Sequence, residues 1–260
     1  MSEYLLDTPR SFAELRACEA LQRRIDPPVQ APVPAWFLWE VERSGGILLA
    51  VFNGVGIARE PLGLVLALPR GDHGLRVVLY GVIHGRPDGD VIRGELLAGL
   101  RDAARDRGAA AIVWPFDPLE VEWAEFLLEG AGARARSYEL RRARTGEIQA
   151  FRALALVKEG RGEAAWRGAS LGSFFPVNAT RPAAGGLREP VSWNLHLGAE
   201  RLLLEVPSVG LSRLPGPLRD AWTGAWAALE EYMDRGYGLV GLYRQRDRAF
   251  LVLERMSRDR

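Results

Sequence analysis

The sequence predicts an α/β fold built on a mixed, mostly antiparallel sheet flanked by helices. Two compact apolar runs, 46–52 and 62–68, are joined by a glycine-rich link and have the length of strands, which predicts antiparallel neighbours. A strand at 76–83, a helix at 91–107 and a strand at 109–114 follow in close succession. Because a crossover helix normally joins parallel strands, the two strands of this unit are predicted to be parallel.

Two helices are predicted to precede the sheet. In Ser11–Ile25 the apolar residues recur at spacings of three and four, and Ser11 can cap the helix together with Glu14. Ala35–Arg43 forms a second, shorter helix after the breakers Pro32 and Pro34.

The second half of the chain alternates further helices and strands. We predict helices at 119–129 and 218–235 and a proline- and glycine-rich loop at 175–190. Strands are predicted at 133–141, 151–157 and 200–206, and a hairpin at 237–243 and 249–254.

Charge and hydropathy exclude several classes of partner. The 34 basic and 33 acidic residues leave a net charge of +1, so no long-range field draws in nucleic acid or an anionic membrane. The apolar runs are shorter than a membrane-spanning helix requires. Residues 1–10 lack the basic and apolar regions of an export signal, which indicates a cytoplasmic protein.

A single cysteine, Cys18, lies among apolar residues at helical spacing and is predicted to be a small buried hydrophobe. His73 and His196 are isolated, and no spacing of metal-ligating residues indicates a metal.

Two stretches carry a resemblance to a known family. RDRGAAAIVWPFDPLEVEWAEFLLEGAGARARSYEL is similar to the GxxxIxWxFDPL … LGA … Y region of a bacterial branch of predicted GNAT acetyltransferases. ERLLLEVP and GYGLVGLYRQRDRAFLVLER are similar to the same branch's C-terminal region. The resemblance implies a GNAT-like core at 1–142, with a C-terminal α+β extension at 143–260 that completes or flanks the same sheet.

The resemblance also implies a function. A GNAT protein would be an N-acyltransferase that uses acetyl-CoA or another acyl-CoA and a small-molecule amine. The alternative is a noncatalytic GNAT-fold module that binds a ligand or a protein partner. The aromatic helix around Trp222, Trp226 and Tyr232 is read first as core packing and second as the surface of a homodimer.

In GNAT proteins the turn after the fourth strand usually carries an (R/Q)xxGx(G/A) signature, whose amides hold the pyrophosphate of coenzyme A. The corresponding stretch here is HGRPDGDVIRGEL. Gly89 keeps one glycine, but Asp88 stands in place of the arginine and Arg93 in place of the last glycine. This altered cradle is expected to bind more weakly, with Arg86 and Arg93 offering side-chain contacts in compensation.

The remaining site residues follow from the same resemblance. Val82, Asp90 and Trp123 are expected beside the cofactor, with Trp123 and Glu125 where the family tends to carry an asparagine and a tyrosine. His84, Tyr80 and Tyr138 are the candidate proton-handling groups, although a turn histidine and an edge-strand tyrosine explain His84 and Tyr138 as well.

Asp117, in the stretch WPFDPL, is read as the N-cap of the helix that follows.

Overall fold

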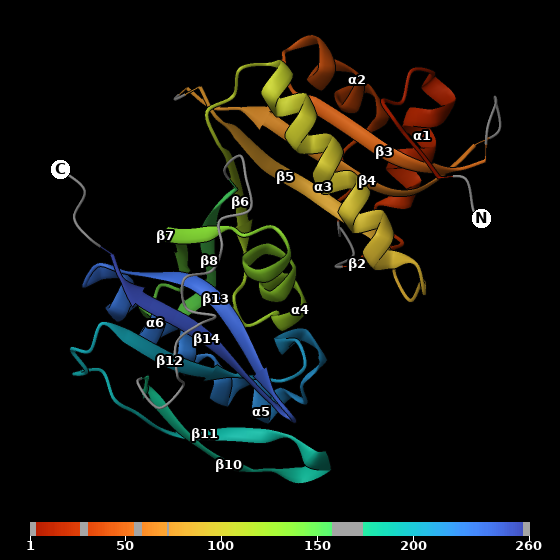
Figure 1. The fold of residues 1–260 in the computed structure, drawn as a ribbon. Coiled ribbons are helices and arrows are strands. Elements are labelled where there is room, and N and C mark those ends of the chain that lie inside the picture. The colour runs from red at the N-terminus through yellow and green to blue at the C-terminus, as the bar shows by residue number, and fades with distance from the viewer. Residues whose placement is uncertain (1–3, 27–30, 55–58, 72, 158–173, 257–260) are drawn as a thin grey trace. The chain divides into compact units, whose positions relative to one another are not determined.

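The computed structural model describes residues 4–26, 31–54, 59–71, 73–157 and 174–256. The chain divides into two compact units, Met1–Trp114 and Pro115–Arg260 (Figure 1).

The N-terminal unit is built on strands in the order β1-β3-β4-β5-β6, and β2 pairs with the carboxyl end of β5. Neighbouring strands are antiparallel except β5 and β6, which are parallel with Leu75 opposite Ile112. Both the antiparallel pair and the parallel unit predicted from the sequence are confirmed. The strands are β1 (Tyr4–Asp7), β2 (Ile25–Asp26), β3 (Ile47–Asn53), β4 (Glu60–Pro69), β5 (Leu75–Ile83) and β6 (Ile112–Phe116), and the residues of β6 up to Trp114 belong to this unit.

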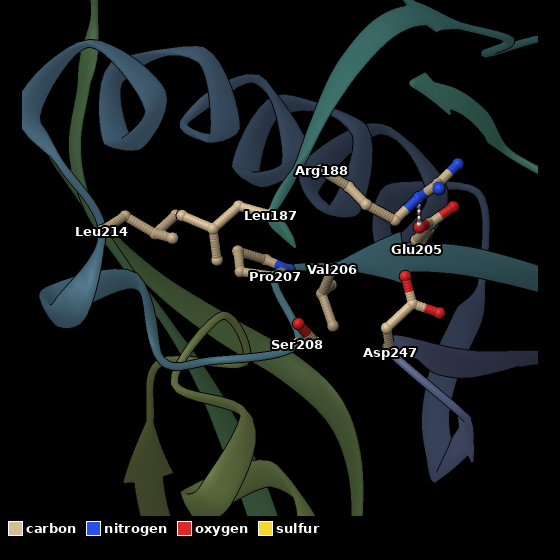
Figure 2. Close-up of a pocket in the computed structure, with 8 residues that line it drawn as sticks. All are labelled: Leu187, Arg188, Glu205, Val206, Pro207, Ser208, Leu214 and Asp247. Atoms are coloured by element: carbon tan, nitrogen blue, oxygen red, sulfur yellow. Dashed lines mark hydrogen bonds and ion pairs between the residues drawn. The ribbon is translucent and has the colours of Figure 1, made fainter. Parts of the chain in front are cut away.

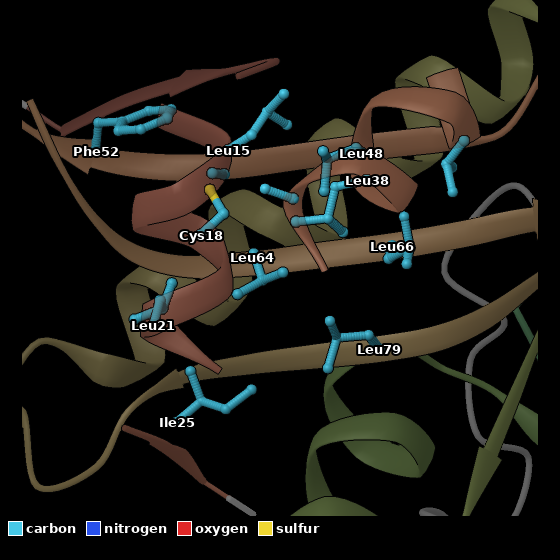
Figure 3. Close-up of a cluster of buried hydrophobic side chains, with 13 residues drawn as sticks. Leu15, Cys18, Leu21, Ile25, Leu38, Leu48, Phe52, Leu64, Leu66 and Leu79 are labelled. Carbon is cyan, nitrogen blue, oxygen red and sulfur yellow. The ribbon is translucent and has the colours of Figure 1, made fainter. Parts of the chain in front are cut away.

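Helices cover both faces of this sheet: α1 (Phe12–Leu21) and α2 (Ala35–Arg43) lie on one face and α3 (Gly89–Asp106) on the other (Figure 1). The α1 and α2 face is a continuous apolar cluster in which Cys18 is completely buried (Figure 3). The burial of Cys18 confirms the prediction of a small buried side chain. It also raises the pKa of the thiol to about 12. On the α3 face, a Cβ on Gly63 would lie 3.0 Å from Ile92 Cγ2, so the glycine permits close packing of α3 on β4.

The first helix begins where the sequence predicts and ends earlier. Ser11 accepts a hydrogen bond from the Glu14 amide, and the Glu14 side chain accepts one from the Ser11 amide, which completes the predicted capping box. The prediction of a helix as far as Ile25 was wrong. Ile25 instead pairs with Ile83 of β5, because its side chain is buried as part of the apolar cluster there.

In the C-terminal unit the sheet strands follow the order β8-β7-β13-β14-β12-β9. Only the β12–β9 pair in this sheet is parallel among the strands described. A separate two-stranded sheet, β10–β11, occupies the stretch predicted as a loop at 175–190, so that prediction was wrong. The strands are β7 (Arg134–Arg142), β8 (Ile148–Val157), β9 (Phe175–Pro176), β10 (Asn178–Pro182), β11 (Arg188–Trp193), β12 (Arg201–Val206), β13 (Tyr237–Gln245) and β14 (Arg248–Arg255).

The helices of this unit differ from the prediction in detail. The helix predicted at 119–129 consists of α4 (Val121–Ala124) and a π-helical segment, η1 (Glu125–Gly130). The helix predicted at 218–235 is divided into α5 (Gly216–Trp222) and α6 (Gly224–Asp234). The division falls at Thr223, whose amide and hydroxyl both bond the Asp220 carbonyl, at 3.2 and 2.7 Å, and so tighten the last turn of α5.

The aromatic side chains of α5 and α6 are buried inside the unit, with Trp222 and Tyr232 at most 1% exposed. The packing interpretation of these residues is therefore confirmed, and they form no exposed dimer surface.

The fold class, a mixed and mostly antiparallel α/β arrangement flanked by helices, is confirmed. The strand β13 of the predicted extension pairs with β7 of the predicted core, with Leu239 opposite Ala135. The domain boundary at residue 142 stays a prediction. No helix in the described part of the chain is long and apolar enough to cross a membrane.

Candidate functional site

The turn between β5 and α3 is the candidate site of the N-terminal unit. β5 ends at Ile83, Gly85 turns the chain with a φ of +74°, and α3 begins at Gly89. The carboxyl end of a strand and the N-terminus of the next helix therefore meet here, and this is where α/β proteins hold anionic ligands. The structure brings together seven candidates from the sequence at this turn, namely Tyr80, Val82, His84, Arg86, Gly89, Asp90 and Arg93.

Arg86 and Asp88 form a bidentate ion pair within the turn. Arg86 Nε lies 2.8 Å from Asp88 Oδ1 and Nη2 lies 2.6 Å from Oδ2, with the two side chains 29% and 23% exposed. The hydroxyl of Tyr4, from β1, also donates to Asp88 Oδ2. The Arg86 guanidinium first, and the Tyr4 hydroxyl second, lower the pKa of Asp88 to about 2. The carboxylate is thus ionised and fully engaged with donors of this chain.

Arg93 is paired more loosely. Its Nη2 lies 2.8 Å from Asp90 Oδ1, and Asp90 is 93% exposed. The Arg93 side chain also lies beside the start of the helix, since a Cβ on Gly89 would be 3.7 Å from Arg93 Nη2. A ligand that approached Gly89 would therefore meet this side chain.

Tyr80 and Val82 lie behind the turn on β5 and are 7% and 2% exposed. The Tyr80 hydroxyl donates to the Arg93 carbonyl at 3.1 Å, and its ring packs edge-to-face on Trp114 at 4.7 Å. Burial raises the pKa of Tyr80 well above its ordinary value. Tyr80 therefore keeps its proton and fixes α3 on β5.

His84 is exposed in the turn, and its backbone amide bonds the Arg24 carbonyl at 3.0 Å. Of the two candidate proton-handling residues near the turn, His84 is exposed and Tyr80 is buried.

The other candidates belong to the C-terminal unit. Tyr138 of β7 stacks on Phe151 and donates to Asp234 of α6 at 2.5 Å, and partial burial and then Asp234 raise its pKa to about 12. Trp123 of α4 is half-buried and packs edge-to-face on Phe126. Glu125 is paired with Arg244 at 2.9 Å.

Asp117 follows β6. The prediction that it is the N-cap of α4 was wrong. The N-cap position of α4 is Glu120, whose side chain makes no capping bond. Asp117 Oδ1 instead accepts the Leu119 amide at 2.9 Å and the Trp226 indole N–H at 3.1 Å. Proline at 118 separates Asp117 from the helix, so its carboxylate closes the turn before α4.

The C-terminal unit also contains a small pocket of about 10 Å³ (Figure 2). Its polar side is organised by Glu205, which is 2% exposed and accepts bonds from Arg188 Nε at 2.9 Å, Arg248 Nη2 at 2.5 Å and Thr180 Oγ1 at 2.8 Å. These bonds join β10, β11, β12 and β14, so the cluster holds the β10–β11 hairpin on the sheet. The lining residues are Leu187, Arg188, Glu205, Val206, Pro207, Ser208, Leu214 and Asp247.

Neither the Tyr4–Asp88 contact nor the Glu205 cluster could be predicted from the sequence, because both join segments that are distant along the chain. Among the residues that the structure describes, no three of the His, Cys, Asp and Glu side chains gather as a metal site.

Comparison with known proteins finds no matching family model and no matching curated protein. Among solved structures, the chain is similar to the ribosomal-protein-S18-alanine N-acetyltransferase of Escherichia coli, with 12% identity, a TM-score of 0.45, and coverage of 62% of this chain and 97% of the other. An aminoglycoside 6'-acetyltransferase type Ii gives 18% identity, a TM-score of 0.47, and coverage of 60% and 96%. The diaminobutyrate acetyltransferase of Paenibacillus lautus, solved with its substrate and coenzyme A, gives 13% identity, a TM-score of 0.45, and coverage of 61% and 96%. The solved structures similar to this chain thus include N-acetyltransferases, the class of protein that the sequence resemblance names.

Proposed function

We propose that the chain is a GNAT-fold protein that binds an acyl-CoA at the β5–α3 turn and transfers the acyl group to an amine, with an altered pyrophosphate cradle. One observation carries the proposal. The crossover from β5 through α3 to the parallel strand β6 places an arginine and a helix N-terminus together at the end of β5. Cations and helix N-termini both favour phosphate.

Within this proposal Arg86 is the principal phosphate contact. Its guanidinium already forms a planar two-bond contact with a carboxylate, and a phosphate can accept the same pair of bonds. Val82, Gly89 and Asp90 border the ligand from the end of β5 and the first turn of α3.

Two features weaken the site. Binding requires Arg86 to leave Asp88, a half-buried pair with two hydrogen bonds. It also requires Arg93 to move away from Gly89, which costs little, because an exposed i,i+3 pair contributes only about 0.3–0.5 kcal/mol. The first cost is the larger one, so Asp88 is the main reason for weak binding.

For the chemical step, His84 is the proposed base for the acceptor amine. Tyr80 and Tyr138 remain the other candidates, but each hydroxyl already donates to an acceptor of this chain, and each pKa is raised. A phenol in this state releases its proton reluctantly.

The same observation favours a second candidate function, a noncatalytic module that binds a ligand or partner through the same fold. The two functions differ in one measurable product. An acyltransferase releases free coenzyme A when acetyl-CoA and an amine are supplied together, and His84→Ala lowers that rate. A module releases none with any amine.

Calorimetric titration with acetyl-CoA tests the binding step. Arg86→Ala is expected to weaken binding about tenfold or more, since one charge-assisted pair is lost. Arg105→Ala is the control, because Arg105 also pairs with an aspartate, the exposed Asp102, at the other end of α3. Equal losses in the two variants, or none in Arg86→Ala, would exclude the β5–α3 turn as the site.

A further inference from the structure

The N-terminal strand reaches the candidate site through one side chain. Tyr4 of β1 donates its hydroxyl to Asp88, and β1 itself pairs with β3 along its whole length. Farther along α3, Gly99 lies against Leu6, so β1 and α3 are also in close apolar contact. Tyr4 is therefore held over the first turn of α3 by strand pairing on one side and by packing on the other.

Asp88 accepts bonds from two different segments at once. Arg86 supplies two donors from the turn and Tyr4 supplies one from β1. Of these donors, the guanidinium edge of Arg86 is the one that a phosphate would bind at the same place. The carboxylate of Asp88 occupies this edge, and the Tyr4 hydroxyl bonds the carboxylate there.

We propose that Tyr4 and Asp88 act as an internal competitor for phosphate at the β5–α3 turn, so that ligand binding exchanges the Asp88 carboxylate for a phosphate on Arg86 and releases Tyr4 from α3. The inference rests on the proposed function for the location of the site and adds its regulation. The ligand class is a compound with a pyrophosphate or terminal phosphate group.

The hydrogen bond from Tyr4 regulates how strongly Asp88 competes for Arg86. This bond orients the Asp88 carboxylate toward Arg86, so removing the hydroxyl weakens the Arg86–Asp88 pair without changing any charge. Removing the Asp88 charge frees Arg86 directly. Both changes must therefore strengthen anion binding, and the second must do so more.

The test is calorimetric titration with inorganic pyrophosphate at low ionic strength. We expect Tyr4→Phe to bind about threefold more tightly than the wild type and Asp88→Asn about tenfold more tightly. Asp102→Asn is the control, because it removes one carboxylate from an exposed pair with Arg105 at the other end of α3, and its gain in affinity should be below about twofold. In a protein that also carries Arg86→Ala, Asp88→Asn should no longer increase the affinity for pyrophosphate.

Three results would overturn the inference: an affinity of Tyr4→Phe equal to that of the wild type, a gain in Asp102→Asn as large as in Asp88→Asn, or no pyrophosphate binding by any variant. Failure of the proposed function has a different signature. If the affinities of the variants for pyrophosphate follow the expected order while acetyl-CoA binds to none of them, the inference about Tyr4 and Asp88 is supported and the acyl-CoA assignment is wrong. Amide hydrogen exchange in β1 supplies a second readout, since pyrophosphate should speed exchange in β1 of the wild type and change it little in Tyr4→Phe.

Discussion

The indole N–H of Trp226 donates to Oδ1 of Asp117 at 3.1 Å, so a helix near the end of the chain binds the carboxyl group that follows β6. Burial raises the pKa of Asp117 from 3.8 to about 6, and the charge of Glu120 adds to the rise, whereas the bonds from Leu119 and Trp226 and the charge of Arg152 oppose it. Asp117 is therefore neutral in the folded protein at a pH where it is ionised in the unfolded chain.

The raised pKa makes stability depend on pH in a defined direction. A folded-state pKa above the unfolded value favours the neutral carboxyl, so its contribution is complete below about pH 4 and is lost as pH rises through about 6. Asp117→Asn keeps an oxygen that can accept both bonds and carries no charge. We expect this variant to be more stable than the wild type at pH 7, by at most about 3 kcal/mol, and equal to it near pH 4.

Urea denaturation at a series of pH values checks this. A constant difference between the two proteins from pH 4 to pH 7 would show that Asp117 titrates in the folded protein as it does in the unfolded chain.

Glu205 is expected to be the most sensitive charged residue of the C-terminal unit. Its removal leaves Arg188 and Arg248 without the carboxylate that they share, and Arg188 is only 21% exposed. Breaking a buried ion pair from one side typically costs about 3–5 kcal/mol, so Glu205→Ala should lower the free energy of unfolding by about 3 kcal/mol.

Glu189→Ala is its control, because Glu189 pairs with the mostly exposed Arg181 on the same hairpin and should cost less than about 1 kcal/mol. Thermal or urea melts decide between them, and similar losses in the two variants would mean that Glu205 does not hold the hairpin.

The predicted boundary at residue 142 can be tested by truncation. A chain that ends there loses β8 and β13, the two strands that pair with β7. With β7 unpaired on both sides, the fragment should aggregate or give a poorly dispersed NMR spectrum. A soluble fragment with a well-dispersed spectrum would establish residues 1–142 as an independent domain.

Elements defined by their own residues were predictable from the sequence. The capping box of Ser11 and Glu14, the bounds of α2 and the β13–β14 hairpin all depend on side chains a few positions apart. The β10–β11 hairpin was missed because its strands are mostly exposed or half-buried and show no regular apolar alternation. Its fold depends on Glu205, which lies beyond it in the chain.

At the candidate site, too, the local arrangement was predictable from the sequence and the long-range contacts were not. That Arg86, Gly89 and Arg93 lie together followed from the resemblance of HGRPDGDVIRGEL to the pyrophosphate signature. Their pairing did not, because Asp88 is held in part by Tyr4, 84 residues earlier in the chain. Sequence spacing likewise could not indicate that Arg93 lies beside Gly89, since that depends on the side-chain direction at the start of α3.

Titration of acetyl-CoA into the wild type and Arg93→Ala tests whether the β5–α3 turn is an acyl-CoA site with an obstructed phosphate cradle. Alanine preserves the helix and removes only the side chain that lies beside Gly89. We predict a wild-type Kd no tighter than about 100 μM, or about −5.5 kcal/mol, and a Kd at most about twofold lower in Arg93→Ala, because the pair that holds Arg93 contributes only about 0.3–0.5 kcal/mol. Micromolar binding by the wild type that disappears in Arg93→Ala would contradict this account and make Arg93 a phosphate clamp.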